Sequence, residues 1–435
     1  MNDNWLISDN YDGRIAFAIG IVTSLCFGYN YFANNVMLVY FASALLFIGV
    51  SFLSIEKATI LLFIICPNTY FIMIGSSAIC GYLAIVLLVR LLWINPRIKS
   101  KVFIPVVVFI IYVIMQAVML DIYIRIVPFI KSLVFVLLFS LLYDCYSDRA
   151  KDLTNRICEA YIFGALMSCI LSIALYIIFG RRVISLSVFD RFTGLTKDPN
   201  YFSATLAFAF SLALTICLKK MKFSIIDIVS ILILVVTGLL TLSRGFLLTI
   251  VVVGIFCIIS VLKTRGSKKI GLVLGIIIGS LSLILILRSM QSVWNSFVAR
   301  IHDDTYSGGS GRTDYWLLYL QRIGSSIIGI VFGNGPEKLL VDSGYVRDVS
   351  HNTFLDLLYE FGILGSLIYS TIYINFGNQL KSINNHFRIE IGYFLPLMAI
   401  VVSYSLLTAL TGDNFVLTVL LSVSVIIIMP NYELP

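Results

Sequence analysis

Long apolar runs alternate with short polar segments along almost the whole chain. Runs of roughly 17–25 apolar residues are long enough to cross a bilayer as a helix. Such runs begin near Ile15, Val36, Ala58, Ser77, Val102, Ile122, Ile157, Tyr201, Phe223, Gly245, Ile270, Thr353, Ile389 and Asn414. The runs at Ala58 and Ile122 are weaker, because each contains a proline and polar residues. The pattern predicts an all-α polytopic membrane protein with about 12–14 transmembrane helices.

Residues 288–352 form the longest polar segment between apolar runs. Within it, 292–298 has the composition of an amphipathic helix lying on a membrane, and 313–323 has helical apolar spacing. The Ser-Gly-Gly-Ser-Gly stretch at 307–311 and the Gly-Asn-Gly-Pro turn at 333–336 are typical loop punctuation. The first of these stretches has a second interpretation, as the joint of a lid that covers a substrate.

Composition favours the same class of protein. Hydrophobic residues make up 59% of the 435 residues and charged residues 12%, with a mean hydropathy of +0.99. We therefore expect one integral membrane domain over residues 1–435. The polar start of the chain, with no small-residue cleavage pattern after the first apolar run, predicts no cleavable signal peptide. The eight cysteines lie in or beside apolar runs, which predicts buried thiols, no disulfide framework and no metal site or other cofactor.

Lysine and arginine clusters fall in every second loop. They include Arg97 with Lys99, Lys219 with Lys220, and the group around Arg265. Since cytoplasmic loops are enriched in these residues, both termini are predicted to be cytoplasmic. Segments 180–200 and 288–352 are then predicted to lie outside. The net charge of +8 follows from this arrangement, so a nucleic-acid partner is not needed to explain it.

Three arginines, Arg191, Arg244 and Arg312, are predicted on this outer face. A guanidinium beside hydrocarbon is costly and is a functional-site hypothesis. One interpretation is that each side chain reaches the lipid headgroups. The other is that several cations at one membrane surface bind a diphosphate, whose oxygens accept paired donors from a guanidinium.

The segments that contain these arginines resemble the O-antigen ligase and Wzy-type O-antigen polymerase superfamily. The similar pieces are R-F-T-G with D-P-N at 191–200, L-T-L-S-R-G at 240–245, S-G-R at 310–312, F-G-N-G at 332–335, and H-N with L-Y-E-F-G at 351–362. The resemblance covers about Arg191 to Gly365, in the family's order. The first third of the chain has membrane character only.

The resemblance implies a membrane glycosyltransferase of the C type on the outer face of the bacterial inner membrane. Its donor would be an oligosaccharide on undecaprenyl diphosphate, and a chain-length regulator and a flippase would be further partners. The implied site contains Arg191, Arg244, Arg312, Asn200 and Asn352 as substrate-binding residues. The chain has no Asp-x-Asp pair, so we expect arginines rather than a metal to stabilise the charge on the departing diphosphate.

Glycan transfer also needs a base, and the chain has three histidines. His386 is predicted in a cytoplasmic loop, and His302 lies within the outer loop. His351 lies at the mouth of a predicted helix, where the headgroup of a lipid-linked donor would rest. An imidazole accepts a proton readily near neutral pH. We therefore predict His351 as the general base, with Arg312 and Arg244 as the other catalytic residues.

Asn352 has two interpretations. It, or Thr353, caps the helix that follows, with Asp356 completing a capping box. Alternatively, Asn352, Asp356 and Glu360 recur every four residues on one helix face and assist His351 or an arginine. Both remain open for Asn352, and for Glu360 we favour a structural ion pair.

Other function classes predict other patterns. A lipid or polysaccharide flippase has a similar number of spans, but is expected to have short loops, a charged central pathway and repeated halves. A structural subunit of an assembly machine needs neither the outer arginines nor the histidine. Within the enzyme class, polymerase and ligase share the quoted motifs. We favour the polymerase, because the N-terminal half resembles no ligase pattern.

Overall fold

The computed structural model describes most of the chain. The described residues are 11–68, 73–74, 77–96, 100–120, 126–180, 191–196, 198–263, 272–279, 312–335, 350–384, 388–407 and 413–430, with single positions at 270, 281, 295, 298 and 299. Several predicted features lie outside them. These are most of the surface helix at 292–298, the glycine-rich joint at 307–311, His302, His386 and most of the 180–200 loop.

The described chain is helical apart from one short antiparallel hairpin, in which β1 (Met73–Ile74) pairs with β2 (Ser77–Ala78). Before the long outer segment, the helices with described bounds are α1 (Tyr11–Ala33), α2 (Val36–Phe52), α3 (Ile55–Ile65), α4 (Ile79–Ile94), α5 (Ser100–Leu120), α6 (Ile126–Cys145), α7 (Ala150–Phe179), α8 (Pro199–Lys220), α9 (Ile225–Leu240) and α10 (Arg244–Lys263), and residues 272–279 are helical as well. Within and after that segment lie α13 (Arg312–Gly324), α14 (Ile327–Phe332), α15 (Thr353–Ile383), α16 (Leu395–Tyr404) and α17 (Asp413–Ile428).

The helices follow the predicted apolar runs in order, so the all-α polytopic fold is confirmed. Among the described residues, five helices are long and apolar enough to cross a membrane, and six further apolar helices are shorter. The weak run at Ala58 is divided as its proline indicates, because α3 ends at Ile65 and a 3-10 turn follows at Cys66–Asn68. The number of spans stays a prediction.

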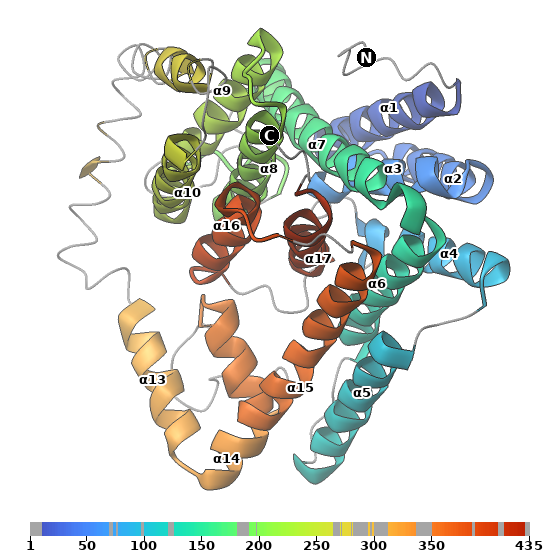
Figure 1. The fold of residues 1–435 in the computed structure, drawn as a ribbon, viewed down its shortest axis with the longest axis vertical. Helices are drawn as coiled ribbons and strands as arrows, with labels where there is room; N and C mark the ends of the chain where they lie inside the picture. The colour runs from blue at the N-terminus through green and yellow to red at the C-terminus, as the bar shows by residue number, and fades with distance from the viewer. Residues whose placement is uncertain are drawn as a thin grey trace.

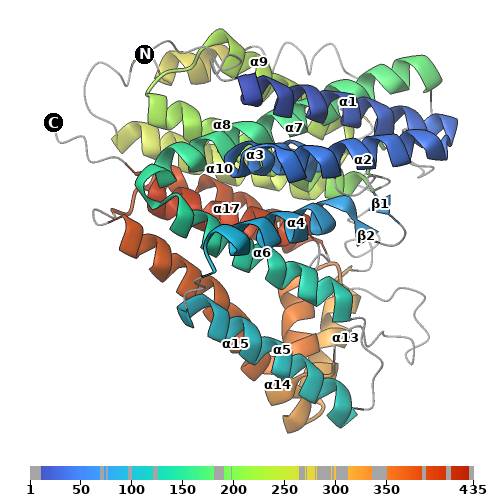
Figure 2. The same ribbon diagram turned by 90° about the vertical axis from the view of Figure 1, so that its right-hand side faces the viewer.

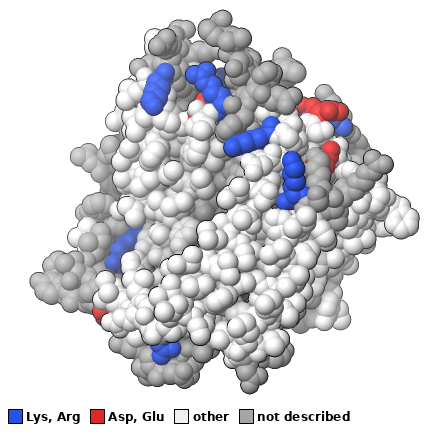
Figure 3. Space-filling model, turned by 60° about the horizontal axis from the view of Figure 1, so that its bottom comes forward, with Lys and Arg blue, Asp and Glu red and all other residues white. Residues whose placement is uncertain are grey.

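Most helices share one hydrophobic core, in which α8 is buried along nearly its whole length (Figure 1). All eight cysteines are free, and six of them are buried. Many large apolar side chains point outward instead, including Phe52 at 84% and Trp93 at 89% exposure. Figure 3 shows a wide uncharged surface, with charged side chains mostly toward its upper rim. Such a surface needs lipid as its solvent.

A second, small hydrophobic cluster lies apart from this core. It contains Tyr319 and Ile323 of α13 and Tyr359 of α15. The α15 helix breaks at Gly362, where φ is 61° and ψ is −170°. We use the term arm for α13, α14 and residues 353–361, the part of α15 before this break. The arm lies at one end of the molecule, and the second half of α15 runs beside α5 (Figures 1 and 2).

Candidate functional site

The Arg191–Asn200 segment docks onto the turn between α9 and α10. The backbone N–H of Phe192 donates to the carbonyl of Leu240 at 3.1 Å, and Arg191 Nε donates to the carbonyl of Thr241 at 3.0 Å. Gly194 has a φ of +55°, and a Cβ there would lie 2.6 Å from the ring of Phe202. A glycine is therefore required for this close turn.

Asp198 and Pro199 begin α8 in the way that their sequence indicates. Asp198 is the N-cap, and its carboxylate accepts from the backbone N–H groups of Asn200 at 2.6 Å and Tyr201 at 3.4 Å. Pro199 is the first helical residue, where its missing N–H costs nothing. This cap places the side chain of Asn200 in the first turn of α8.

The turn before α10 is equally tight. Leu242 has a φ of 49°, and Ser243 Oγ accepts from the backbone N–H of Phe246 at 3.4 Å. A Cβ on Gly238 would lie 1.9 Å from the Phe246 ring, so only glycine allows α9 and α10 to approach this closely. Arg244 is thereby the first residue of α10. The N-terminus of a helix carries a positive partial charge, which favours a bound anion.

Asn200 links the two segments. Its Oδ1 accepts from Arg191 Nη2 at 2.7 Å and from Ser243 Oγ at 3.3 Å. Because the amide oxygen is engaged by two donors, the NH₂ group is what Asn200 can offer to a ligand. Arg191 thus holds Asn200 and the α9–α10 turn in place.

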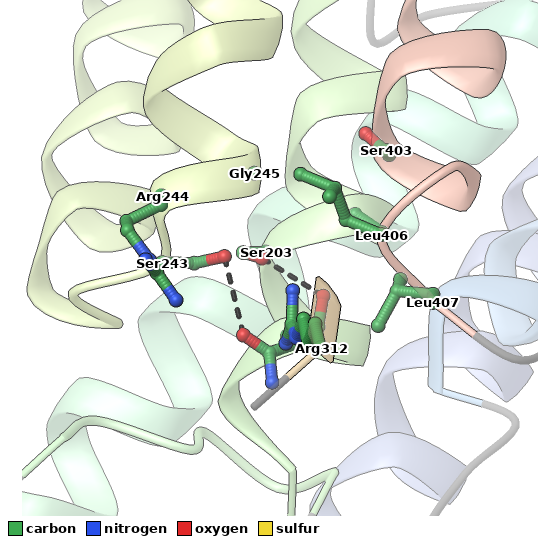
Figure 4. Close-up of a pocket in the computed structure, with 10 residues that line it drawn as sticks. Ser203, Ser243, Arg244, Gly245, Arg312, Ser403, Leu406 and Leu407 are labelled. Carbon is green, nitrogen blue, oxygen red and sulfur yellow. Dashed lines mark hydrogen bonds between the residues drawn. The ribbon is translucent and has the colours of Figure 1, made fainter. Parts of the chain in front are cut away.

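A small pocket that is open to solvent lies at this point. Three of the predicted site residues line it: Asn200, Arg244 and Arg312. The other lining residues were not predicted, and they come from α8, the α9–α10 turn and the end of α16: Ser203, Ala204, Ser243, Gly245, Ser403, Leu406 and Leu407. Figure 4 shows Arg244 and Arg312 on separate elements beside Ser243 and Ser203. The two guanidinium groups give the pocket the chemistry of an anion site.

Arg312 reaches the pocket from the arm. It is the first residue of α13, and α13 contacts both the turn before α15 and the start of α15 itself. Trp316 Nε1 donates to the carbonyl of Ser350 at 2.9 Å, and the rings of Tyr319 and Tyr359 lie 4.7 Å apart. The pairing of the predicted 313–323 helix with the H-N segment could not be predicted from spacing alone.

His351 lies in the turn between Ser350 and α15. It is half-buried, and its φ of 55° is left-handed, a conformation in which histidine is several-fold enriched among non-glycine residues. His351 is not among the pocket-lining residues, but its turn is bonded to segments that are. Beside the Trp316–Ser350 bond, Thr353 Oγ1 donates to the carbonyl of the pocket residue Leu407. The predicted role of His351 as a base stays a prediction.

Asn352 is the N-cap of α15. Its Oδ1 accepts from the backbone N–H groups of Phe354 and Leu355, each at 3.1 Å. The side-chain oxygen of Asn352 therefore caps the helix. The predicted capping box of Thr353 with Asp356 is wrong, because the Thr353 hydroxyl bonds to Leu407 and Thr353 is already helical. Asp356 is buried instead, at 4% exposure.

The F-G-N-G and E-F-G motifs interlock at the far end of the arm. The backbone N–H of Asn334 donates to the Tyr359 carbonyl at 2.9 Å, and that of Gly335 to the Glu360 carbonyl at 3.0 Å. A Cβ on Gly333 would lie 2.3 Å from the carbonyl oxygen of Glu360. These glycines therefore allow two backbones to touch. The ion pair favoured for the Glu360 side chain stays a prediction.

In the part of the chain that the structure describes, no group of three or more His, Cys, Asp or Glu is placed to hold a metal ion. The metal independence of the transfer reaction stays a prediction.

One comparison with known families identifies a match. Residues 228–370 match the family model described as O-antigen ligase. The matched segment is about a third of the chain, and includes Ser243, Arg244, Arg312 and His351, but not Arg191, Asn200 or α16. A search of curated proteins found no match. The matched segment runs through both arginines of the pocket, so this part of the polytopic helical chain is similar to the O-antigen ligase family.

Proposed function

We propose that this protein is a membrane glycosyltransferase that takes a glycan from a polyprenyl diphosphate, specifically undecaprenyl diphosphate, and acts as an O-antigen or related surface-polysaccharide polymerase. The acceptor is the terminal sugar of another lipid-linked repeat unit. The observation that carries the proposal is the meeting of Arg244 and Arg312 at one pocket beside the N-terminus of α10. Two guanidinium groups and a helix N-terminus together suit a diphosphate.

The proposed reaction is a displacement at the anomeric carbon of the donor. The acceptor oxygen forms a bond to that carbon, and the bond from the carbon to the diphosphate oxygen breaks. The electron pair leaves with the diphosphate, whose growing charge Arg244 and Arg312 stabilise. The proton of the acceptor hydroxyl passes to the imidazole of His351, which lies on the turn bonded to Trp316 and Leu407.

The remaining predicted site residues support this arrangement in two ways. Asn200 presents its NH₂ group to the donor, while Arg191 holds Asn200 from behind. Asn352 caps α15 and so orients the turn that contains His351. Arg191 and Asn352 therefore act as positioning residues in the proposal, whereas Asn200 contacts the substrate.

A second candidate is an O-antigen ligase, which transfers the finished glycan to the lipid A core. One observation favours it, because the matched family model is described as O-antigen ligase. The donor and the chemistry at the diphosphate are the same for both enzymes. They differ in the acceptor.

Complementation distinguishes the candidates. The gene is expressed in strains that lack the polymerase, the ligase or the exporter of lipid-linked units, and lipopolysaccharide is separated on a gel. We expect a ladder of repeat units in the polymerase-deficient strain. Transfer of glycan to a bare core in the ligase-deficient strain assigns the ligase instead. Rescue of the export-deficient strain alone contradicts both and favours a flippase.

The proposal also sets an orientation in the inner membrane, with the pocket facing the periplasm and both termini in the cytoplasm. We expect a cysteine at Ser325, after α13, to react with a membrane-impermeant thiol reagent added from outside, and one at Ser382, near the end of α15, not to react. Both positions are exposed in the structure, so burial does not explain a difference between them.

The parent for this labelling carries Cys26→Ser and Cys145→Ser, which removes the two half-buried thiols. Permeabilised cells provide the control, because both positions should then be labelled. Labelling of Ser382→Cys alone in intact cells would invert the orientation and place the pocket in the cytoplasm.

A further inference from the structure

The arm has a hydrophobic cluster of its own and meets the main core at Leu357 and Phe361. Its hydrophobic cluster, built on Tyr319, Ile323 and Tyr359, is separate from the main core. One end of the arm contains Arg312 and adjoins the turn of His351. The other end is the interlocked pair of segments Phe332–Gly335 and Tyr359–Gly362, which we call the junction. The orientation of the arm at the junction therefore determines where Arg312 meets the pocket.

The junction contains backbone carbonyls that no helix can satisfy. The last carbonyls of a helix have no partner inside it. Phe332 is the last residue of α14, and Glu360 and Phe361 directly precede the break at Gly362. The burial of such groups costs free energy unless another element supplies donors.

Two side chains of α5 supply those donors. The Tyr112 hydroxyl lies 2.7 Å from the carbonyl oxygens of both Phe332 and Phe361. Gln116 Nε2 donates to the carbonyls of Phe332 and Glu360, at 2.6 Å each. Each α5 side chain therefore joins α14 to α15. Both are buried, at 9% for Tyr112 and 4% for Gln116.

The rest of α5 does not explain why Tyr112 and Gln116 are polar. Much of that helix faces outward, with Val118 at 76% and Met119 at 66% exposure, and none of its residues lines the pocket. A tyrosine hydroxyl and a glutamine amide on a membrane helix are retained where they satisfy partners. Here the partners are the carbonyls of the junction.

We infer that Tyr112 and Gln116 are positioning residues for transfer, which act by holding the arm so that Arg312 closes the donor pocket. The inference rests on the proposed function for its catalytic consequence and on the junction for its geometry. An α-helix of 13 residues, the length of α13, is roughly 20 Å long, at about 1.5 Å a residue. A tilt of about 10° over that length displaces its far end by roughly 3 Å, about the length of a hydrogen bond.

The test removes the donors while keeping side-chain volume. Tyr112→Phe and Gln116→Met are compared with two matched variants on the second half of α15. Tyr369→Phe removes a hydroxyl that bonds to Tyr373, and Gln379→Met removes an amide that bonds to Ser140 of α6. The matched pair loses equivalent groups away from the junction.

Kinetics separate positioning from stability. If the arm occupies its competent position only part of the time, the apparent affinity for the donor falls in proportion. We expect the KM for a purified undecaprenyl-diphosphate glycan to rise about tenfold in each junction variant, with kcat within twofold. Partial unfolding would lower kcat at unchanged KM. The matched variants should keep the wild-type KM.

A structural measurement does not depend on activity. Spin labels at Leu320 of α13 and Leu248 of α10, both about half exposed, report the distance between arm and bundle by pulsed electron resonance in the Cys26→Ser, Cys145→Ser parent. We expect that distance distribution to broaden in Tyr112→Phe and Gln116→Met and not in the matched variants. A pair within the arm, Leu320 with Ile328, should be unchanged throughout.

Unchanged distances together with an unchanged KM would overturn the inference. Should Gln116→Met fail to accumulate, Tyr112→Phe alone decides, because it removes one hydroxyl. If the wild-type protein transfers no glycan, the proposed function fails, while the spin-label distances still show whether α5 holds the arm.

Discussion

We expect His351→Gly to leave a membrane-inserted protein whose transfer activity falls by about 10²–10⁴-fold, the usual loss when a positioned base is removed. Glycine is the appropriate replacement because His351 has a φ of 55°, where alanine would add backbone strain to the loss of the imidazole. The measurement is in vitro transfer from undecaprenyl-diphosphate glycan, at matched amounts of folded protein.

His351→Asn is the matched control for the backbone, because asparagine tolerates left-handed φ values but does not titrate near neutral pH. Its activity should fall as far as that of His351→Gly. Normal chain length in either variant would remove His351 from the mechanism. Activity that is lost only in His351→Ala would show that the backbone conformation, and not the base, is what the residue supplies.

Lysine is expected to replace the pocket arginines poorly. Arg244→Lys and Arg312→Lys keep the charge but lose the planar pair of donors that matches a diphosphate, and we expect each to reduce transfer by about 10²–10³-fold, as when one transition-state donor is removed. Arg191→Lys should also be impaired. The impairment of Arg191→Lys would come from the lost hydrogen bonds to Asn200 and to the Thr241 carbonyl.

Arg322→Lys is the matched control, because Arg322 belongs to the last turn of α13 and does not line the pocket. The assay contains no added divalent metal. Full activity in all three pocket-region variants would support the alternative that these arginines only reach lipid headgroups, where lysine serves equally well. A strict requirement for magnesium or manganese would equally contradict the role given to the arginines.

The sequence by itself determined the helical class of the fold and the approximate start of most helices. Helix formation in a membrane depends on length and apolarity, and both are local properties of the chain. Turn chemistry is local as well. Thus Pro67 divided the third run, Asp198 and Pro199 began α8, and Gly333 marked a close turn.

Local motifs also identified most of the candidate site. Three predicted residues, Asn200, Arg244 and Arg312, line one pocket although they come from three segments. The motifs could indicate that these residues belong together, but they contained no information on direct contacts. That Arg191 holds Asn200, and that the Asn352 oxygen is used as a cap, depends on side-chain geometry.

Only the tertiary structure related the first third of the chain to the site. Tyr112 and Gln116 lie in a run that reads as plain membrane helix, since a single polar side chain in an apolar run does not indicate its partner. Those partners are carbonyls more than 200 residues later, at Phe332 and Phe361. They need donors because α14 ends at Phe332 and Gly362 breaks α15. Where these two helix ends meet α5 depends on the packing of the whole bundle.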